Sequence, residues 1–293
     1  MSDEIAFANT ALESFAALVT FVLLFACIAK IKMQRGIKHV TSKEAKRNTL
    51  DYILIIWLVI HMIVLTADVL SWTAMDFGKN EVWLLFMLNL TFTCLSLECM
   101  VYTYYVKETI YQHEMIGNTY VYLVMLSTVI AIILWISSDI SGKFYYLDTQ
   151  GDYTQGSIYW LCQFYCIIVM CGNIVILLKH RKALVRHDVL SLLMYGLIPI
   201  ASIPAQMLWK STTFNLATTL ALIYICISVH MAQYDRIVEQ EKILIQQEHE
   251  LSMNQMQMMI AQIQPHFLYN SLTALAQLCS KNPKEAKKAI INF

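Results

Sequence analysis

Charged residues are scarce in this chain of 293 residues: Asp, Glu, Lys and Arg make up only 14% of it, whereas 58% of the residues are hydrophobic. This balance excludes an ordinary soluble globular domain, in which about a quarter of the residues are charged. Positive and negative charges are equal in number, so no overall basic field favours a nucleic-acid partner. Glycine is also rare, with 8 residues, and the sequence contains no Gly-rich nucleotide-binding loop and no P-loop.

The 8 cysteines indicate neither disulfides nor a metal site. All but Cys279 lie within apolar stretches, so none is placed in an outward-facing loop, where structural disulfides form. Cys162, Cys166 and Cys171 share one stretch but lack the ligand spacing of a zinc site. We therefore expect no metal site and interpret the cysteines as polarizable side chains that fill the core.

Seven apolar stretches are long enough to cross a bilayer whose hydrocarbon core is about 30 Å thick. They cover residues 9–31, 50–74, 81–106, 119–138, 157–179, 188–209 and 213–233. Pro199 and Pro204 interrupt the sixth, and only a few residues separate it from the seventh, which leaves a re-entrant arrangement open. The sequence therefore predicts an all-α membrane protein with seven transmembrane helices in residues 1–233, embedded in a lipid bilayer.

Positive charges are concentrated in alternate loops of this region. Those loops and their flanks carry Lys30, Lys32, Arg35, Lys38, Lys43, Lys46, Arg47, Lys107, Lys179, Arg181, Lys182 and Arg186. The other loops carry only Lys79, Lys143 and Lys210. Because cytoplasmic loops are enriched in Lys and Arg, we expect a multi-pass protein of the plasma membrane, with the N-terminus outside and residues 234–293 in the cytosol.

A short segment in this C-terminal region, residues 262–273, reads Gln-Ile-Gln-Pro-His-Phe-Leu-Tyr-Asn-Ser-Leu-Thr. His266 follows Pro265, and Asn270, Thr273 and Gln277 continue a polar row along one side of the expected helix. Apolar residues with helical spacing occupy the other side: Leu268, Leu272, Leu275 and Cys279. Such a helix packs its leucines into a bundle and holds His266 outward, within reach of another domain.

The segment closely resembles the phosphoacceptor box of the LytS-like sensor histidine kinases, Gln-x-x-Pro-His-Phe-Leu-Phe-Asn-Ser/Thr-Leu. It departs from that pattern at Tyr269, where Phe is usual, and at Thr273, where Asn is usual. The resemblance covers residues 255–293 and implies that His266 accepts the γ-phosphoryl group of ATP and passes it to a cytosolic response regulator. Phe267 stands where many other histidine kinases carry an acidic base, so Asn270 is the candidate for orienting the imidazole or a hydrolytic water.

ATP and Mg²⁺ are implied by the resemblance, although no motif for binding them is present. In the family, an ATP-binding domain follows the acceptor hairpin, whose second helix would begin at Asn282-Pro283. The sequence stops at Phe293 within that helix. We therefore expect a truncated chain that cannot phosphorylate itself alone.

Residues 234–264 are rich in Gln, Glu and Met. Apolar residues recur in this segment every seven positions, at Ile237, Leu244, Leu251 and Met258, as along one seam of a coiled coil. Their companion positions are polar: Gln240, Gln247 and Asn254. The pattern predicts either a dimeric signalling helix that is held weakly enough to switch between two packings, or a solvated helical spacer.

Residues 144–156, in a predicted outer loop, contain two short aromatic runs around Asp148–Asp152, a pattern typical of a β-hairpin. With seven helices and this loop, the membrane region resembles, more loosely, sensory regions found ahead of histidine kinases and diguanylate cyclases. The hairpin is either a lid over an outward-facing pocket or an ordinary connector.

Ionisable and polar side chains inside membrane helices are costly and therefore become site candidates. His61 and Asp68 are seven residues apart in the second stretch and share one face of it. With Asn89 and Glu13 they would line a pocket for a small-molecule or peptide signal, while Glu98 lies farther along the third stretch. The alternative is interhelical hydrogen bonding that only fixes packing, worth about 0.6 kcal/mol per pair on average.

The combined prediction divides the chain into a sensor region (1–233), a coiled-coil signalling helix (234–264) and a homodimeric phosphoacceptor hairpin (265–293). The predicted function of the protein is that of a transmembrane sensor histidine kinase. A non-enzymatic seven-helix receptor is the main alternative, and a transporter with a broken sixth helix is a lesser one. A retinal protein is excluded because residues 213–233 contain no lysine.

Overall fold

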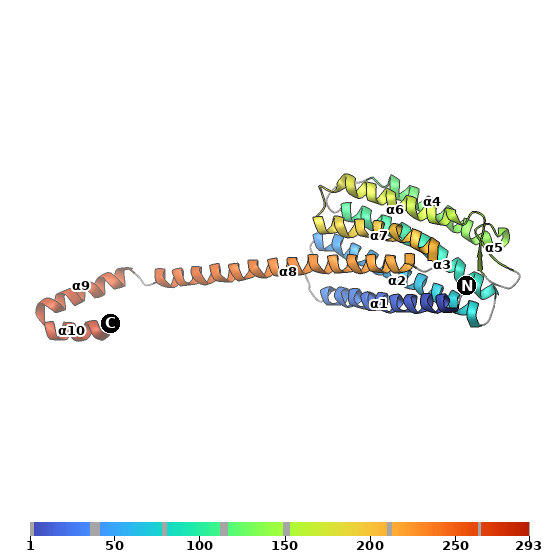
Figure 1. Cartoon of the computed structure of the whole chain (residues 1–293). Helices are drawn as coiled ribbons and strands as arrows, with labels where there is room; N and C mark the ends of the chain where they lie inside the picture. Colours follow the sequence, from blue (N-terminus) through green and yellow to red (C-terminus); the bar gives the residue numbers. More distant parts are fainter. Residues whose placement is uncertain are drawn as a thin grey trace. The chain divides into compact units, whose positions relative to one another are not determined.

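The computed structural model describes residues 3–35, 42–77, 81–111, 117–148, 153–209, 213–262 and 265–292. The chain divides into two compact units, Met1–His230 and Met231–Phe293. The first unit contains the helices α1 (Asp3–Arg35), α2 (Ser42–Phe77), α3 (Glu81–Tyr111), α4 (Thr119–Ile136), α5 (Ser138–Ser141), α6 (Trp160–His180) and α7 (Arg186–Trp209). It also contains the beginning of α8 (Thr213–Gln262), which extends into the second unit (Figure 1).

Among the residues that the structure describes, six helices are long and apolar enough to cross a membrane: Phe7–Lys32, Thr49–Thr73, Glu81–Tyr111, Thr119–Ser141, Arg186–Gln206 and the helix that begins at Thr213. A helix suits a membrane because it satisfies its own backbone hydrogen bonds without water. Large apolar side chains on the outside of the bundle, such as Phe15, Phe25 and Ile133, are exposed, as contact with lipid requires. An all-α membrane protein is therefore confirmed.

The predicted fifth crossing, residues 157–179, falls on α6. The apolar part of α6 that the structure describes, Phe164–His180, is shorter than the other six candidate spans. The sixth predicted crossing, with its two prolines, forms the continuous helix α7, in which Pro199 and Pro204 both lie inside the helix. Seven crossings therefore remain a prediction, whereas six helices meet the length and composition of a span.

The core of the first unit lies around α2 and α3. Helix α2 packs against both α1 and α3, and α3 also contacts α4 and α6. At the centre, Trp57 of α2 is fully buried against Tyr102 of α3 and Tyr195 of α7, with ring centroids 5.6 Å and 4.5 Å away. A buried ion pair, Lys30 Nζ to Asp51 Oδ1 at 2.6 Å, joins the C-terminal part of α1 to the N-terminal part of α2.

The segment predicted as a hairpin contains two short antiparallel strands, β1 (Tyr145–Leu147) and β2 (Tyr153–Gln155), with Tyr146 opposite Thr154. Residues 149–152, which join them, lie outside the described part of the chain. Phe144 and Tyr145 are buried against Trp135 of α4 and Leu84 and Leu88 of α3. Gly142 ends α5 with a left-handed backbone (φ 61°), which glycine adopts without strain.

The second unit contains the rest of α8, then α9 (Pro265–Lys281) and α10 (Pro283–Asn292). Asn282 alone separates α9 from α10, and the two helices pack against each other. Its amide donates to the Leu278 carbonyl, and its own carbonyl accepts from the Ala286 amide. Proline at the first position of α9 and of α10 suits a helix start, because its missing N–H has no helical partner there.

Candidate functional site

Residues 265–273 of the predicted phosphoacceptor box occupy the first turns of α9. His266 is the second residue of this helix, and its side chain lies outside the described part of the structure, as do residues 263–264. Asn270 follows one turn later and is exposed, as are Phe267 at 60% and Tyr269 at 72%. The helix therefore presents the second half of the predicted box to solvent.

The polar row predicted next to His266 is solvent-accessible throughout its described length. Asn270, Thr273 and Gln277 are all exposed, and the Thr273 hydroxyl donates to the Tyr269 carbonyl at 2.7 Å. A phosphoryl group reaches a histidine only if a second domain can approach it closely and in line. This side of α9 leaves room for such an approach within the second unit.

The apolar side of α9 is only partly covered by α10. Leu275 and Leu278 of α9 are half-buried, and Ala286 of α10 is buried. Leu268 and Leu272 remain 43% and 55% exposed, although the sequence predicts that they pack in a bundle. Two helices thus bury one part of the predicted apolar side and leave the other part open in a single copy of the chain.

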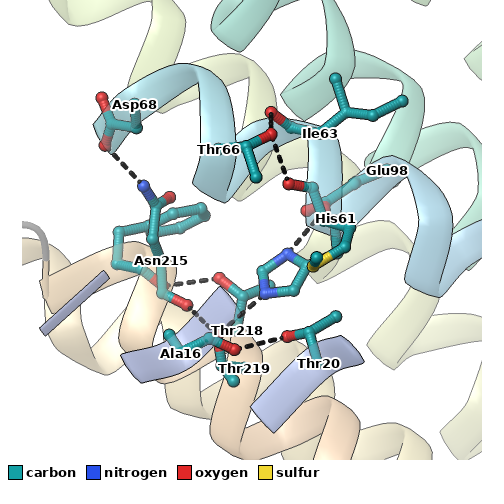
Figure 2. Close-up of polar contacts among 12 residues, drawn as sticks. Ala16, Thr20, His61, Ile63, Thr66, Asp68, Glu98, Asn215, Thr218 and Thr219 are labelled. Atoms are coloured by element: carbon teal, nitrogen blue, oxygen red, sulfur yellow. Dashed lines mark hydrogen bonds and ion pairs between the residues drawn. The ribbon is translucent and has the colours of Figure 1, made fainter. Parts of the chain in front are cut away.

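The intramembrane candidate His61 is fully buried and binds two other helices (Figure 2). Its Nδ1 lies 2.7 Å from Oε1 of Glu98 on α3, and its Nε2 lies 2.8 Å from the Thr219 hydroxyl on α8. The Thr219 hydroxyl donates its proton to the Asn215 carbonyl at 2.8 Å, so His61 Nε2 must be the donor to Thr219. His61 thereby joins α2 to α3 and α8.

Asp68 and Glu13 meet at one residue of α8. The Asn215 side-chain nitrogen donates to Oδ2 of Asp68 at 2.9 Å and to Oε1 of Glu13 at 3.0 Å. Glu13 is fully buried in α1, whereas Asp68 of α2 is half-buried. Because Asn215 and Thr219 are four residues apart, they lie on the same face of α8 and connect the carboxyl pair to the His61 contacts.

Asn89 does not join these residues. Its amide nitrogen donates to Oδ2 of Asp139 at 2.7 Å, and its carbonyl oxygen accepts a hydrogen bond from the Tyr145 hydroxyl. Asn89 thus anchors α5 and β1 to α3. Its partners lie in the segment between α4 and α6, whereas Glu13 and Asp68 meet at Asn215, and a ligand pocket lined by the four residues stays a prediction.

The sequence-based list of ligand candidates omitted three residues of this network, namely Glu98, Thr219 and Asn215. Glu98 is recognisable as an ionisable residue inside a membrane helix, which needs a partner there. Thr219 and Asn215 are ordinary in composition. Their only signal is an Asn-x-x-x-Thr spacing within the apolar stretch 213–233, which places two hydrogen-bonding side chains on one helix face.

Comparison with known proteins adds one finding and one negative result. Residues 254–293 match the family model described as Histidine kinase, a stretch that includes α9 and α10 and the end of α8. No curated protein matches the chain. The C-terminal part of this membrane protein is therefore similar to the histidine kinase family.

Proposed function

We propose that this protein is a transmembrane sensor histidine kinase of a two-component system and that His266 is its phosphoacceptor. The observation that carries the proposal is the match of residues 254–293 to the histidine kinase family, in the segment that holds the Pro265-His266 pair. The exposed polar side of α9 supports it, because the acceptor must meet both an ATP-binding domain and a response regulator.

His266 acts as the nucleophile, and its imidazole must be neutral to attack. ATP supplies the phosphoryl group, and we place ATP and Mg²⁺ in a separate catalytic domain of the protein. Phe267 follows the histidine directly and cannot act as a base. Asn270 lies one turn along α9 on the same side and is the residue that orients the imidazole, or a water molecule in the reverse reaction.

A homodimer is part of this proposal. Leu268 and Leu272 are exposed in one copy, and the heptad residues Leu244, Leu251 and Met258 of α8 are also 57% to 59% exposed. Exposed apolar residues at heptad spacing in a water-facing helix are typical of a coiled coil with a second copy. Two α9–α10 pairs would then complete a four-helix bundle around the leucines.

The first unit is the proposed sensor, with the N-terminus outside and α9 in the cytosol. This orientation rests on the distribution of Lys and Arg. Helix α8 reaches from the membrane region to Gln262 without an interruption, so a displacement at its first turns can be transmitted along it. The signal that the first unit detects is then present in the outer aqueous phase or in the membrane.

Radiolabelled ATP supplied to the full-length gene product in membranes tests the acceptor assignment. We expect label that is lost in acid and stable in base, and that is absent from His266→Gln. His249→Gln is the matched control, because His249 is an exposed histidine on α8 of the same unit. We expect it to be labelled like the unaltered protein.

Label that persists in His266→Gln contradicts the assignment of His266. Absence of any acid-labile label in the unaltered protein instead favours the non-enzymatic seven-helix receptor.

A further inference from the structure

The polar network of the membrane unit runs from a half-buried residue to fully buried ones. Asp68 lies near the end of its candidate span, Thr49–Thr73, and Glu13 and Asn215 lie near the corresponding ends of α1 and α8. His61 and Thr219 lie deeper in α2 and α8, and Glu98 lies inside the span of α3, Glu81–Tyr111. In the proposed orientation the Asp68 end is the outer end, so protons from the outer aqueous phase reach this residue first.

The carboxyl groups of Glu13 and Asp68 cannot both be ionised at low cost. Both accept from the same nitrogen of Asn215, so the two accepting oxygens lie within about 6 Å of each other. Two like charges at this separation repel strongly when one of them is fully buried.

We propose that Glu13 and Asp68 form a proton-binding site that holds α8 through Asn215. At lower outer pH the pair shares a proton and both carboxyl groups stay on Asn215. When the outer pH rises, the shared proton leaves to water or hydroxide, the two carboxylates repel each other, and the Asn215 bridge between α1 and α2 opens. The first turn of α8 is then free to move.

His61 and Glu98 are the other titratable groups that face this network, from α2 and α3. On the described parts of α1, α2 and α8 up to His230, the remaining titratable groups of the spans lie at least about two and a half helical turns along their helices from Glu13, Asp68 or Asn215: Cys27, Lys30, Lys32, Asp51, Tyr52, Tyr224, Cys226 and His230. Tyr195 of α7 packs on Trp57, one turn from His61 toward the other end of α2. An experiment must therefore distinguish proton release from the Glu13–Asp68 carboxyl pair from proton release at the His61–Glu98 pair.

Regulation of a kinase by this site rests on the proposed function, but the proton site itself can be tested without phosphorylation. The 293-residue chain in lipid vesicles is titrated from about pH 6 upward, where exposed carboxyl groups, with pKa values near 4, are already ionised. Infrared difference spectra then report the loss of a protonated carboxyl C=O band. We expect this band in the unaltered protein, in Glu241→Gln and in Glu98→Gln, and its loss in Glu13→Gln and in Asp68→Asn.

Glu241 is an exposed acid on α8 outside the network and serves as the matched control. Asn215→Leu keeps both carboxyl groups, and we expect it to shift the band because the amide donor is lost. If Glu13→Gln or Asp68→Asn fails to insert into the membrane, Asn215→Leu still tests the site. A band that persists in both carboxyl variants, or one that disappears in Glu98→Gln instead, overturns the proposal.

The consequence for signalling is measured on the full-length protein in right-side-out vesicles, with the inner pH fixed and the outer pH varied. We expect the rate of His266 labelling to change about fivefold or more across the band's titration, and Asp68→Asn to remove that change. If the carboxyl band titrates while the rate of His266 labelling stays constant, the proposed link from the carboxyl pair to α8 is overturned. A titrating band without any His266 label contradicts the proposed kinase function and supports the proton site alone.

Discussion

His61 connects three helices inside the membrane unit. Its ring binds Glu98 of α3 and Thr219 of α8, and it is itself part of α2. A buried polar group that loses its partner retains the cost of leaving water, which is about 1–3 kcal/mol. The contribution of this residue to stability is therefore measured by removing its partners one at a time.

Replacement of Glu98 by leucine is expected to lower the free energy of unfolding by about 1–3 kcal/mol, because Nδ1 of His61 then has no acceptor or donor facing it. Unfolding of the first unit in detergent, followed by circular dichroism against added sodium dodecyl sulfate, measures this change. The double variant His61→Leu, Glu98→Leu is expected to be more stable than the sum of the single variants predicts, by about 1 kcal/mol.

The matched control is Glu241→Leu, an acid-to-leucine change on the exposed part of α8, for which we expect a change within about 0.5 kcal/mol. Strict additivity of His61→Leu and Glu98→Leu would show that the 2.7 Å contact between them contributes nothing to stability.

At the scale of elements, the Ser138 hydroxyl of α5 makes three hydrogen bonds to the backbone at the start of the β1–β2 pair. The Ser138 hydroxyl donates to the Tyr145 carbonyl at 2.8 Å and accepts from the Tyr145 and Phe144 amides at 3.0 Å and 3.2 Å. The buried aromatic residues Phe144 and Tyr145 add apolar contacts to α3 and α4. This packing favours the interpretation of the segment as a connector, and both the connector and the lid stay predictions.

Ser138→Ala leaves three backbone groups without their side-chain partner and is expected to destabilise the β1–β2 pair by about 1–3 kcal/mol. Amide hydrogen exchange at Tyr145 and Leu147 should become about tenfold faster or more, since 1.4 kcal/mol corresponds to a factor of ten. Ser141→Ala, which removes only a 3.4 Å contact to the exposed Lys143 amide, should leave the exchange unchanged. Equal effects of the two changes would show that Ser138 does not hold the strands.

Helix α8 is the only described element that belongs to both units, so regulation has to pass along it if the proposed function is correct. Insertion of two glycines after Gln247 costs about 1 kcal/mol of helix stability per residue and shifts the heptad phase. We expect such a protein to keep basal His266 labelling and to lose its dependence on outer pH. The matched control is an insertion of seven helix-forming residues at the same point, which preserves the phase and should retain regulation.

Regulation that survives the two-glycine insertion contradicts transmission along α8. Loss of regulation in the seven-residue insertion as well would mean that helix length, and not phase or stiffness, is the property that matters.

The helices were predictable because a membrane span needs a long apolar run, and such runs are visible in the sequence. The start of α10 at Pro283 was predictable for a similar reason, because proline suits the first helical turn. The partners of the intramembrane residues were not predictable. Helical periodicity assigns His61 and Asp68 to one face, but which helix lies opposite depends on packing over residues distant in sequence, such as Asn215.

The case of Asn89 shows the same limit. Its position in the third apolar stretch gave no sign that its partners are Asp139 and Tyr145, which belong to the segment between α4 and α6. Leu268 and Leu272 illustrate the opposite situation, since their spacing predicts burial that a single copy of the chain does not provide.

For the whole molecule, the proposed homodimer predicts contacts between copies along the heptad seam of α8. Cysteines introduced at Leu244 or Leu251 should crosslink efficiently in membranes, in a background in which the exposed Cys171 and Cys279 are replaced by serine. Lys242→Cys is the matched control, because this position lies on the outer side of a coil whose seam contains Leu244. A monomeric mass for the detergent-extracted protein, or equal crosslinking at all three positions, would contradict the dimer.

The assignment of His266 as phosphoacceptor is tested by locating the phosphoryl group on the chain. Cleavage of the ATP-labelled full-length protein after Lys242 and Lys281 gives a peptide from Ile243 to Lys281 that contains two histidines, His249 and His266. Fragmentation of this peptide by electron transfer, under neutral or basic conditions that preserve phosphohistidine, separates the two positions. We expect phosphate on His266 and an unmodified His249. Phosphate on His249, on another residue of the chain, or on none would contradict the assignment.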